Sequence, residues 1–447
     1  MEVKGKKITV LGGGRSGLAA ARLLNRQGAV VFLSESRREE DVAEAAGRLE
    51  QAQIAFETGG HTHAVYEADL MVVSPGIAVD SDILKQAKRM GIPVYSELEI
   101  AGWFCKSPII AVTGSNGKTT TTSLIGRIFQ DAGIPTVVAG NIGTAFSDFA
   151  DQVPPEGMVV LEVSSFQLET IHDFHPNVAV FLNLTPDHLD RHETMETYGR
   201  MKARIFENQE ASDILVYNGL DIRVSRLAKQ ARGRRAVFGI ETAGNACAYM
   251  ENWQLVLKNR EDRIVLMPAD EMQIRGEHNM ANAMAAALSA WMMDVPVDVI
   301  RKGLAEFQAL PHRLEPVRTV KEVLWVNDSK ATNVDAVWYA LGSFTRPVIL
   351  IAGGRDKNSD FSFLRERIKS HVREIILIGE SAEKMKKSFT GIVPLSLAAD
   401  LDEAVAMAAN RAQAGDVVLL SPACASFDMF EDYMDRGEKF KKLVHQL

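Results

Sequence analysis

The feature that most constrains this chain is a strand, a glycine turn and a helix start within residues 109–120, which read IIAVTGSNGKTT. The β-branched run predicts a short buried strand, and the glycines predict a tight turn before a helix that continues to Phe129. Backbone N–H groups and the positive helix end then face one point, which predicts a phosphate site. Lys118 would reach the outer phosphates and the Thr119 hydroxyl would bind Mg²⁺, although Gly114 lies closer to Lys118 than the usual GxxxxGK[ST] spacing requires.

A second glycine turn follows the first predicted strand, residues 8–11. Gly12, Gly14 and Gly17 satisfy GxGxxG, and a helix and a further strand running up to Glu35 complete a Rossmann-like unit. An acid at this position binds the adenosine ribose in dinucleotide enzymes, so the immediate interpretation is an NAD site. The glycines alone do not fix which nucleotide binds, and a purely structural turn stays an alternative. Two anion-binding turns in separate α/β units predict two phosphorylated ligands.

Acidic and imidazole side chains follow two other predicted strands. Glu162 ends the strand over 158–162, where a Mg²⁺ ligand beside a phosphate loop belongs, and a solvated edge charge is the alternative. The strand over 178–184 leads into a loop, residues 185–192, that holds two Asp, two His and one Arg. This density is typical of a functional site. Its HxxxH spacing lacks a third soft ligand for zinc, so single roles beside magnesium and phosphate are favoured.

The segments after this loop give weaker signals. Lys202, on the next predicted helix, is interpreted from its neighbours alone as a surface lysine. Residues 247–267 predict a small antiparallel extension. Asn279 and Asn282 share one face of a following buried helix by their i,i+3 spacing, which indicates polar contacts, either capping or a ligand.

Three strand ends in the last part of the chain carry polar clusters. These loops read NDSKATN over 327–333, GGRDK over 353–357 and SPACASFD over 421–428. Alternating strands and helices predict a parallel, doubly wound sheet, and ligands bind at the carboxyl edge of such a sheet. The clustering favours ligand contact, although a surface ion pair of Asp328 and Lys330 would be worth little and is the alternative.

Chain length, net charge and cysteine count limit the classes of protein to which this chain can belong. At 447 residues the chain is long enough for about three domains, which we place at 1–96, 97–308 and 309–447. We predict an α/β fold with a Rossmann-like first domain, a P-loop ATPase-like central domain whose mostly parallel sheet carries the antiparallel extension, and a Rossmann-like third domain.

The net charge of −8 offers no basic field to nucleic acid, and the three separated cysteines form neither a disulfide framework nor a metal cluster. Cys424 is expected to be a buried thiol. With no signal peptide and no transmembrane segment, we expect a cytoplasmic protein.

The motifs together carry a resemblance. Residues 113–120 resemble the ATP loop of the Mur ligases and folylpolyglutamate synthases, and residues 327–333 and 421–430 are similar to those of the Mur ligases that add D-glutamate. This resemblance covers all three expected domains in order. It implies an ATP-dependent ligase of peptidoglycan precursor synthesis that joins D-glutamate to UDP-N-acetylmuramoyl-L-alanine through an acyl phosphate, with two Mg²⁺ ions, as a monomer. The N-terminal glycines would then hold the diphosphate of the UDP-sugar.

The resemblance also assigns residues to each ligand. It implies that ATP contacts Gly114, Ser115, Asn116, Gly117, Lys118, Thr119, Thr120, Asn279, Asn282, Arg313 and Asp328. It implies that the UDP-substrate contacts Arg15, Ser16, Ser36, Arg37, Ser74, Asn141 and His188. It implies that D-glutamate contacts Lys330, Thr332, Lys357, Ser426 and Phe427. The catalytic and metal positions it implies are Lys118, Thr119, Glu162, His188 and Lys202, the last as a carbamate whose new carboxylate helps a second Mg²⁺.

Two other classes of function stay open on the sequence. One is an NAD-dependent oxidoreductase, which rests on the GxGxxG turn and Glu35 and has no account of Lys118 and Thr119. The other is a nucleotide-binding regulatory module without catalysis. Binding of NAD and turnover of ATP discriminate the three.

Overall fold

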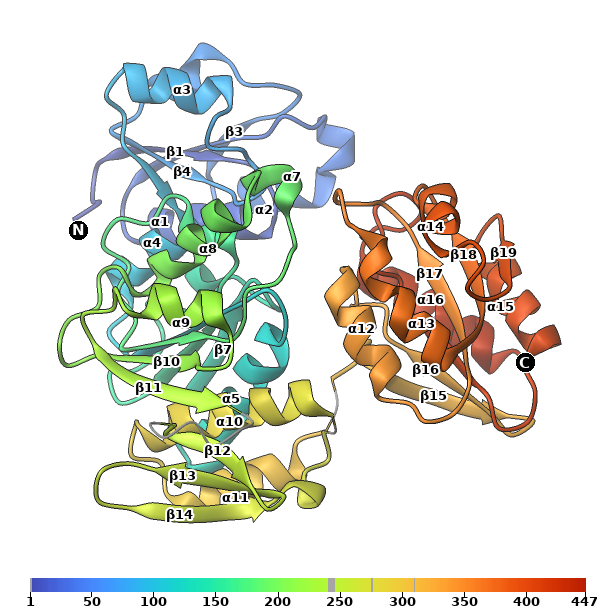
Figure 1. Cartoon of the computed structure of the whole chain (residues 1–447). Helices are drawn as coiled ribbons and strands as arrows, with labels where there is room; N and C mark the ends of the chain where they lie inside the picture. The colour runs from blue at the N-terminus through green and yellow to red at the C-terminus, as the bar shows by residue number, and fades with distance from the viewer. Residues whose placement is uncertain (1, 240–245, 275, 309) are drawn as a thin grey trace. The chain divides into compact units, whose positions relative to one another are not determined.

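The computed structural model describes residues 2–239, 246–274, 276–308 and 310–447, and it contains three separate sheets with flanking helices (Figure 1). By Cα proximity the chain divides into two compact units. One unit comprises Met1–Leu184, Gly199–Glu271 and Ala281–Glu306, and the other comprises Thr185–Tyr198, Met272–Met280 and Phe307–Leu447. The predicted α/β class is confirmed. The limits predicted for three domains stay a prediction.

The N-terminal sheet is parallel throughout, in the order β3-β2-β1-β4-β5. Its strands are β1 (Lys7–Leu11), β2 (Val30–Ser34), β3 (Ala55–Glu57), β4 (Leu70–Val73) and β5 (Val94–Ser96). The intervening helices are α1 (Arg15–Arg26), α2 (Ala43–Gln51) and α3 (Asp82–Arg89), with 3₁₀ turns η1 (Glu39–Asp41) and η2 (His63–Tyr66). The strand order reverses between β1 and β4, which is where open α/β sheets bind ligands. The Rossmann-like prediction is confirmed.

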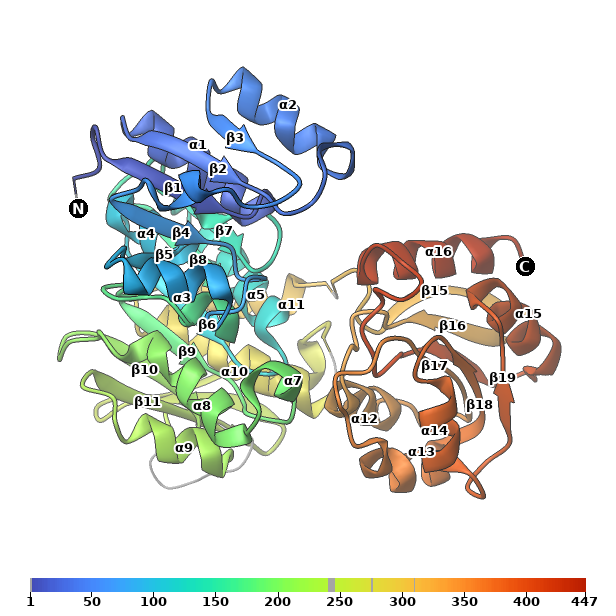
Figure 2. The same cartoon turned by 90° about the horizontal axis from the view of Figure 1, so that it is seen from above.

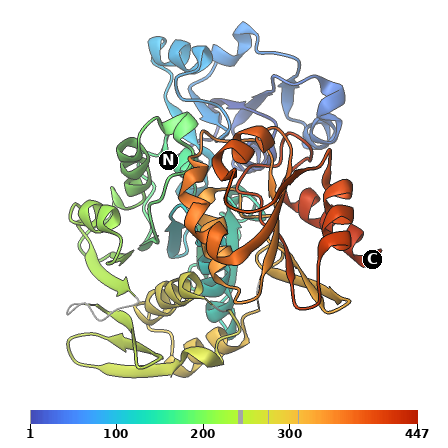
Figure 3. The same ribbon diagram turned by 45° about the vertical axis from the view of Figure 1, so that its right-hand side comes forward.

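The central sheet has the order β14-β13-β12-β11-β10-β9-β6-β8-β7. Its strands are β6 (Ile109–Thr113), β7 (Thr136–Gly140), β8 (Met158–Glu162), β9 (Val178–Phe181), β10 (Ile214–Asn218), β11 (Arg234–Gly239), β12 (Ala248–Glu251), β13 (Gln254–Lys258) and β14 (Arg263–Pro268). Every residue of β6 is buried, which explains a continuous apolar run rather than an alternating one. Among the described strands of this sheet, only the β12–β13 and β13–β14 pairs are antiparallel, so the predicted extension is confirmed (Figure 3).

Helices between residues 97 and 306 connect these strands. They are α4 (Glu97–Phe104), α5 (Lys118–Asp131), α6 (Ser165–Leu168), α7 (Leu189–His192), α8 (Met195–Ala203), α9 (Ile222–Ala228), α10 (Glu277–Trp291) and α11 (Val297–Glu306), with 3₁₀ turns η3 (Phe146–Asp148), η4 (Arg204–Phe206) and η5 (Ala269–Glu271). The residues of α10 from Asn282 to Ala290 are all buried, as the sequence predicts. Of the helices in the described ranges, none is long and apolar enough to cross a membrane.

The C-terminal sheet has the order β15-β16-β20-β17-β18-β19, and only β15 is antiparallel to its neighbour. Its strands are β15 (Glu315–Val320), β16 (Val323–Asn327), β17 (Val348–Gly353), β18 (Val372–Ile378), β19 (Leu395–Leu397) and β20 (Val417–Leu420). Its helices are α12 (Val334–Gly342), α13 (Arg365–His371), α14 (Ala382–Phe389), α15 (Leu401–Arg411) and α16 (Tyr433–His445), with the 3₁₀ turn η6 (Phe361–Leu364). Leu350 of β17 packs into the core with α12, α13 and α14, and Ile351 packs into the core with α15 and α16 (Figure 2). Successive side chains therefore fill opposite faces, as in a doubly wound sheet.

Candidate active site

The predicted phosphate loop joins β6 to α5, and two glycines shape it. Gly114 has φ +153°, and a Cβ added there would lie 3.0 Å from the Leu182 Cβ. Gly117 has φ +84° and caps the start of α5 at Lys118. Both residues adopt backbone conformations that glycine alone tolerates well. The strand, turn and helix start predicted from the sequence are confirmed, and they leave the N-terminus of α5 as the natural position for an anion.

Two lysines converge on this loop. The Lys118 ammonium donates to the carbonyl oxygens of Gly114, at 2.9 Å, and Ser115, at 2.8 Å. The Lys202 ammonium donates to the same Gly114 oxygen at 2.8 Å, and the Lys202 side chain is only 1% exposed. The interpretation of Lys202 as a surface lysine is therefore wrong. The short helix α8 gives no apolar pattern that marks the position as buried, and the acceptor lies 88 residues away in the chain.

Asn183 fixes the shape of the loop, and sequence reasoning misses it. Its side chain accepts from the Asn116 N–H at 2.8 Å and donates to the Asn116 carbonyl at 3.0 Å. Its own carbonyl accepts from the Ser115 N–H at 3.1 Å. Asn183 follows β9, which pairs with β6, so neighbouring strand ends are the signal that could have found it. The amides of Ser115 and Asn116 therefore hold the loop in shape.

Glu162 ends β8 opposite Val112 of β6, and it is 2% exposed. The alternative of a solvated edge charge is wrong. Its carboxylate accepts from the Asn141 side-chain amide at 2.7 Å. The Thr119 hydroxyl, at the start of α5, is also buried. A carboxylate and a hydroxyl are hard oxygen ligands, so the chemistry of this pair fits Mg²⁺. Within the described residues, no group of three or more His, Cys, Asp or Glu side chains is arranged to hold a metal.

The structure brings Asn282 to the phosphate loop. A Cβ added at Gly117 would lie 2.2 Å from the Asn282 side-chain oxygen, so α10 at Asn282 packs directly against the loop. Asn279 lies one turn earlier on α10, and the structure assigns it to the second compact unit. The predicted contact of Asn282 with a nucleotide at this loop stays a prediction that the geometry favours.

The N-terminal glycine turn is closed by an internal carboxylate. The Gly13 N–H donates to Glu35 at 2.7 Å, and the Arg37 guanidinium pairs with the same carboxylate at 3.0 Å. Burial would raise the pKa of Glu35, but the hydrogen bonds from Arg37 and Gly13 outweigh it and lower the pKa to about 2. Ser36 also donates to Glu35, at 3.3 Å. The carboxylate that an NAD site would offer to ribose is thus already occupied by protein donors.

Close packing explains the last glycine of this turn. A Cβ added at Gly17 would lie 1.9 Å from the Gly12 carbonyl oxygen. The Ser74 hydroxyl, which follows β4, donates to that oxygen at 3.3 Å. Gly12 and Ser74 therefore meet at the point where the strand order reverses. Ser16 follows Arg15 in the first turn of α1.

Arg15 links this turn to Glu162, a predicted metal ligand. Its guanidinium donates to the carbonyl oxygens of Gly143 and Asn141, the latter at 3.2 Å. Asn141 in turn holds Glu162 through its side chain. Two predicted UDP-substrate residues and one predicted metal ligand therefore form a continuous set of contacts.

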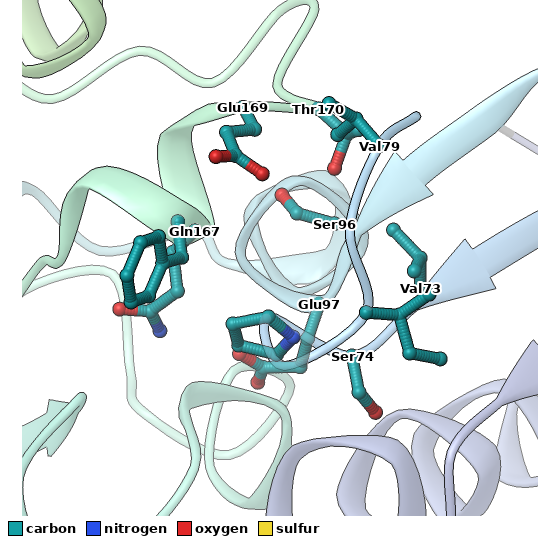
Figure 4. Close-up of a pocket in the computed structure, with 11 residues that line it drawn as sticks. Val73, Ser74, Val79, Ser96, Glu97, Gln167, Glu169 and Thr170 are labelled. Atoms are coloured by element: carbon teal, nitrogen blue, oxygen red, sulfur yellow. The ribbon is translucent and has the colours of Figure 1, made fainter. Parts of the chain in front are cut away.

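A small cavity of about 10 Å³ lies beside Ser74, with room for about one water molecule. Figure 4 shows Ser74 after β4, Ser96 and Glu97 at the start of α4, and Gln167 on α6 gathered around it. Glu97 is 1% exposed and accepts from the Ser147 N–H at 2.6 Å. Burial raises the pKa of the Glu97 carboxyl.

In the second unit, Asp187 connects several predicted residues. Its carboxylate lies 3.3 Å from the Lys357 ammonium and accepts from the Asn333 amide at 3.2 Å. The His188 N–H donates to it at 2.9 Å, and the His188 ring nitrogen Nε2 lies 3.5 Å from it. His188 adopts φ +53°, a left-handed conformation that is uncommon outside glycine.

The loop after β16 (residues 328–333) holds a buried acid. Asp328 is 7% exposed and accepts from the Ser421 hydroxyl at 2.8 Å and the Leu314 N–H at 3.1 Å, so its carboxylate is a buried group and not a surface charge. Burial raises the pKa of Asp328 to about 7, against the lowering effect of Ser421, Leu314 and Arg313. A carboxyl with this pKa changes charge near neutral pH.

The predicted D-glutamate residues lie on this loop and on the loop after β20 (residues 421–432). The Lys330 ammonium stands 5.0 Å from the centre of the Tyr433 ring, and the Thr332 N–H donates to the Lys330 carbonyl at 2.9 Å. Ser426 is 2% exposed, whereas Phe427 is 61% exposed. Cys424 is 1% exposed and burial raises its pKa to about 12, which confirms a buried thiol.

Three family models match successive parts of the chain. The "Mur ligase MurD-like, N-terminal domain" matches residues 6–96, the "Mur ligase middle domain" matches residues 112–290, and the "Mur ligase, glutamate ligase domain" matches residues 312–424. Each predicted loop discussed above lies within or next to one of these matches.

Relatives match over the whole length. A UDP-N-acetylmuramoylalanine–D-glutamate ligase of Salinibacter ruber is 49% identical, and the alignment covers 100% of this chain and 99% of that protein. The protein of the same name from Chloroherpeton thalassium is 43% identical with the same coverage. Among solved structures, MurF ligase from Thermotoga maritima in complex with ADP has a TM-score of 0.61 at 18% identity, covering 100% of this chain and 96% of that one. UDP-N-acetylmuramate-alanine ligase MurC from Thermotoga maritima has a TM-score of 0.62 at 18% identity, covering 99% of both chains. These two structures support the fold.

Proposed function

The chain belongs to the Mur ligase family, and we propose that it uses ATP to join D-glutamate to UDP-N-acetylmuramoyl-L-alanine in the synthesis of peptidoglycan precursors. The observation that carries this proposal is the 49% identity, over essentially the full length of both chains, with a ligase of that name. A phosphate loop with two converging lysines and a buried acid on the neighbouring strand supports it, because an NAD enzyme has no use for them.

Activation of the acceptor takes place at the phosphate loop. A carboxylate does not react with an amine at neutral pH, because its oxygen is a poor leaving group, and transfer of the γ-phosphoryl group of ATP to it forms an acyl phosphate. Phosphoryl transfer depends mainly on positioning and on neutralisation of charge. Lys118 contacts the outer phosphates, while Asn282 and Arg313 contact the nucleotide.

Two Mg²⁺ ions belong to this proposal. Thr119 and Glu162 would hold the first, and His188 and a carbamylated Lys202 would hold the second. When bound, the ions neutralise negative charge on the transferring phosphoryl group. The Lys202 ammonium lies against the Gly114 carbonyl, and a carbamate retains an N–H that can donate to the same oxygen.

The amine of D-glutamate then attacks the acyl phosphate through a tetrahedral intermediate, and phosphate leaves. Lys330 and Ser426 bind the carboxylates of D-glutamate, together with Thr332, Lys357 and Phe427. Such charge-assisted hydrogen bonds contribute roughly 1.5–3 kcal/mol each.

The UDP-sugar is held at the N-terminal glycine turn by Arg15, Ser16, Ser36, Arg37 and Ser74, and by Asn141 and His188.

The test is release of phosphate from ATP under defined combinations of substrates. We expect release only when UDP-N-acetylmuramoyl-L-alanine and D-glutamate are both present. Replacement of D-glutamate by L-glutamate, or of the UDP-sugar by a folate, should abolish it. Release with either replacement would refute the proposal. A parallel titration with NAD should show no binding.

A further inference from the structure

Arg436, on the first turn of α16, is almost completely buried, with 1% of its surface exposed. Its guanidinium donates to two loops that follow different strands. In the loop after β16 it reaches the Ser329 hydroxyl at 2.9 Å and the Ser329 carbonyl at 2.8 Å. In the loop after β20 it reaches the carbonyl oxygens of Cys424, at 3.2 Å, and Ala425, at 3.4 Å. The Arg436 side chain therefore connects the two loops through hydrogen bonds to both.

This cation forms no ion pair with any carboxylate in the described part of the chain. Burial lowers the pKa of Arg436 to about 10, which still leaves it protonated at neutral pH. A buried charge is costly, and a well-packed apolar side chain often gives equal or greater stability. The planar guanidinium offers several donors in fixed directions, which neither Lys nor an apolar residue can reproduce. The arrangement thus favours control of loop geometry over a gain in stability.

The loops that Arg436 holds carry the proposed D-glutamate residues. Ser329 directly precedes Lys330, and Ala425 directly precedes Ser426. The Ser329 hydroxyl donates onward to the Tyr433 carbonyl at 2.8 Å, so the start of α16 is tied to the same loop by a second bond. A shift of the Arg436 guanidinium would therefore move Lys330 and Ser426, the side chains proposed to bind D-glutamate.

We propose that Arg436 is a positioning residue for D-glutamate. It fixes the separation of Lys330 and Ser426, so that both carboxylates of the amino acid are bound at once. This inference rests on the proposed function, because it assigns the two loops to D-glutamate. It does not require Arg436 to touch the substrate.

The test compares Arg436→Met and Arg436→Lys with a control on the same helix. Phe440 is fully buried on α16 and packs near Trp325, with ring centres 6.1 Å apart, and its phenyl ring has no atom that can donate a hydrogen bond to either loop. Phe440→Leu therefore disturbs the packing of α16 without removing a bond to either loop. For Arg436→Met we expect KM for D-glutamate to rise at least about tenfold, with a smaller rise in KM for ATP, since Asp328 lies on the first loop, and KM for the UDP-sugar within about twofold of the original. Arg436→Lys should recover part of the loss, and Phe440→Leu should leave KM for D-glutamate unchanged even if Tm falls equally.

Hydrogen–deuterium exchange provides a readout that needs no substrate. In Arg436→Met, amides in residues 328–333 and 421–432 should exchange faster, while those of β18 should not change. Unchanged exchange in both loops would overturn the inference, and so would an equal rise in all three KM values. If the unmodified protein releases no phosphate with D-glutamate, the proposed function fails, whatever the exchange experiment shows of the loops.

Discussion

Lys118 and Lys202 donate hydrogen bonds to the same acceptor, the carbonyl oxygen of Gly114, at 2.9 and 2.8 Å. Two ammonium groups therefore meet at one point on the phosphate loop, although 84 positions separate them in the sequence, the difference between 118 and 202. The positive charge of Lys118 at this point suits a polyphosphate.

Replacing Lys118 by Ala should abolish turnover while leaving the UDP-sugar site intact. We expect phosphate release to fall by at least about 10³-fold, because a cation at the developing charge is lost. Binding of the UDP-sugar, measured by calorimetry, should stay within about threefold. Lys302→Ala, on an exposed position of α11, is the matched control and should retain full activity. Equal loss of both readouts would argue against separate sites.

If Lys202 is carbamylated, the activity of the enzyme should depend on carbon dioxide. Because its nitrogen lies buried against Gly114, we expect a carbamate to form there and activity to fall when bicarbonate is removed from the assay. Lys202→Ala should be inactive and should regain some activity with millimolar short-chain carboxylic acids, which replace the missing carboxylate. If neither bicarbonate nor carboxylic acids change the activity, Lys202 acts only as an ammonium group.

Gly117→Ala should damage both the fold and nucleotide binding. The added methyl group would lie 2.2 Å from the Asn282 oxygen, at a backbone position with φ +84°. We expect a loss of about 1–3 kcal/mol in unfolding free energy and much weaker binding of ADP. The double variant Gly117→Ala, Asn282→Ala should recover part of the stability, because the clash is relieved while the backbone strain remains. No recovery would show that backbone strain alone is responsible.

Asp328 should make stability fall as pH rises. Its pKa is about 7 in the folded protein and 3.8 as its ordinary value, so the folded state holds a proton that the unfolded state releases. The resulting stabilisation is complete below about pH 4 and is lost as pH rises through 7. Asp328→Asn keeps a neutral side chain, so its urea midpoint should exceed that of the original protein at pH 8 and match it near pH 4.

The comparison with Asp328→Asn isolates this effect from an opposing one. Burial and Arg313 lower the pKa of His278 to about 4, so its contribution to stability is present above pH 6.5 and is lost as pH falls toward 4. Both proteins retain His278, and the difference between them therefore reports Asp328. A difference that does not change with pH would contradict the raised pKa.

The parts of the fold that are predictable from sequence are those with local signals. The apolar run of β6, the glycines after it and the start of α5 are contiguous, so pattern and structure agree. Strands β3, β5 and β19 have three residues each, too few for a periodic pattern to be visible.

The residues of the candidate site likewise divide into those with a local sequence signal and those without one. Gly114, Lys118 and Glu162 follow from strand ends and loop chemistry. Lys202 and Asn183 do not, because their partners are distant in the chain and only the pairing of β6 with β9 and the folding of α8 bring them close. Arg436 has no local signal either, since an arginine in the first turn of a helix is usually solvated.

Asn141 forms hydrogen bonds with two neighbouring residues, Arg15 and Glu162, through different atoms. Its main-chain carbonyl accepts from Arg15, and its side-chain amide donates to Glu162. A small molecule that fills the proposed UDP-sugar site and shifts this turn would displace the Glu162 carboxylate without competing with ATP. Inhibitors aimed there should therefore raise the apparent KM for the UDP-sugar, and excess UDP-sugar should reverse the inhibition whereas excess ATP should not.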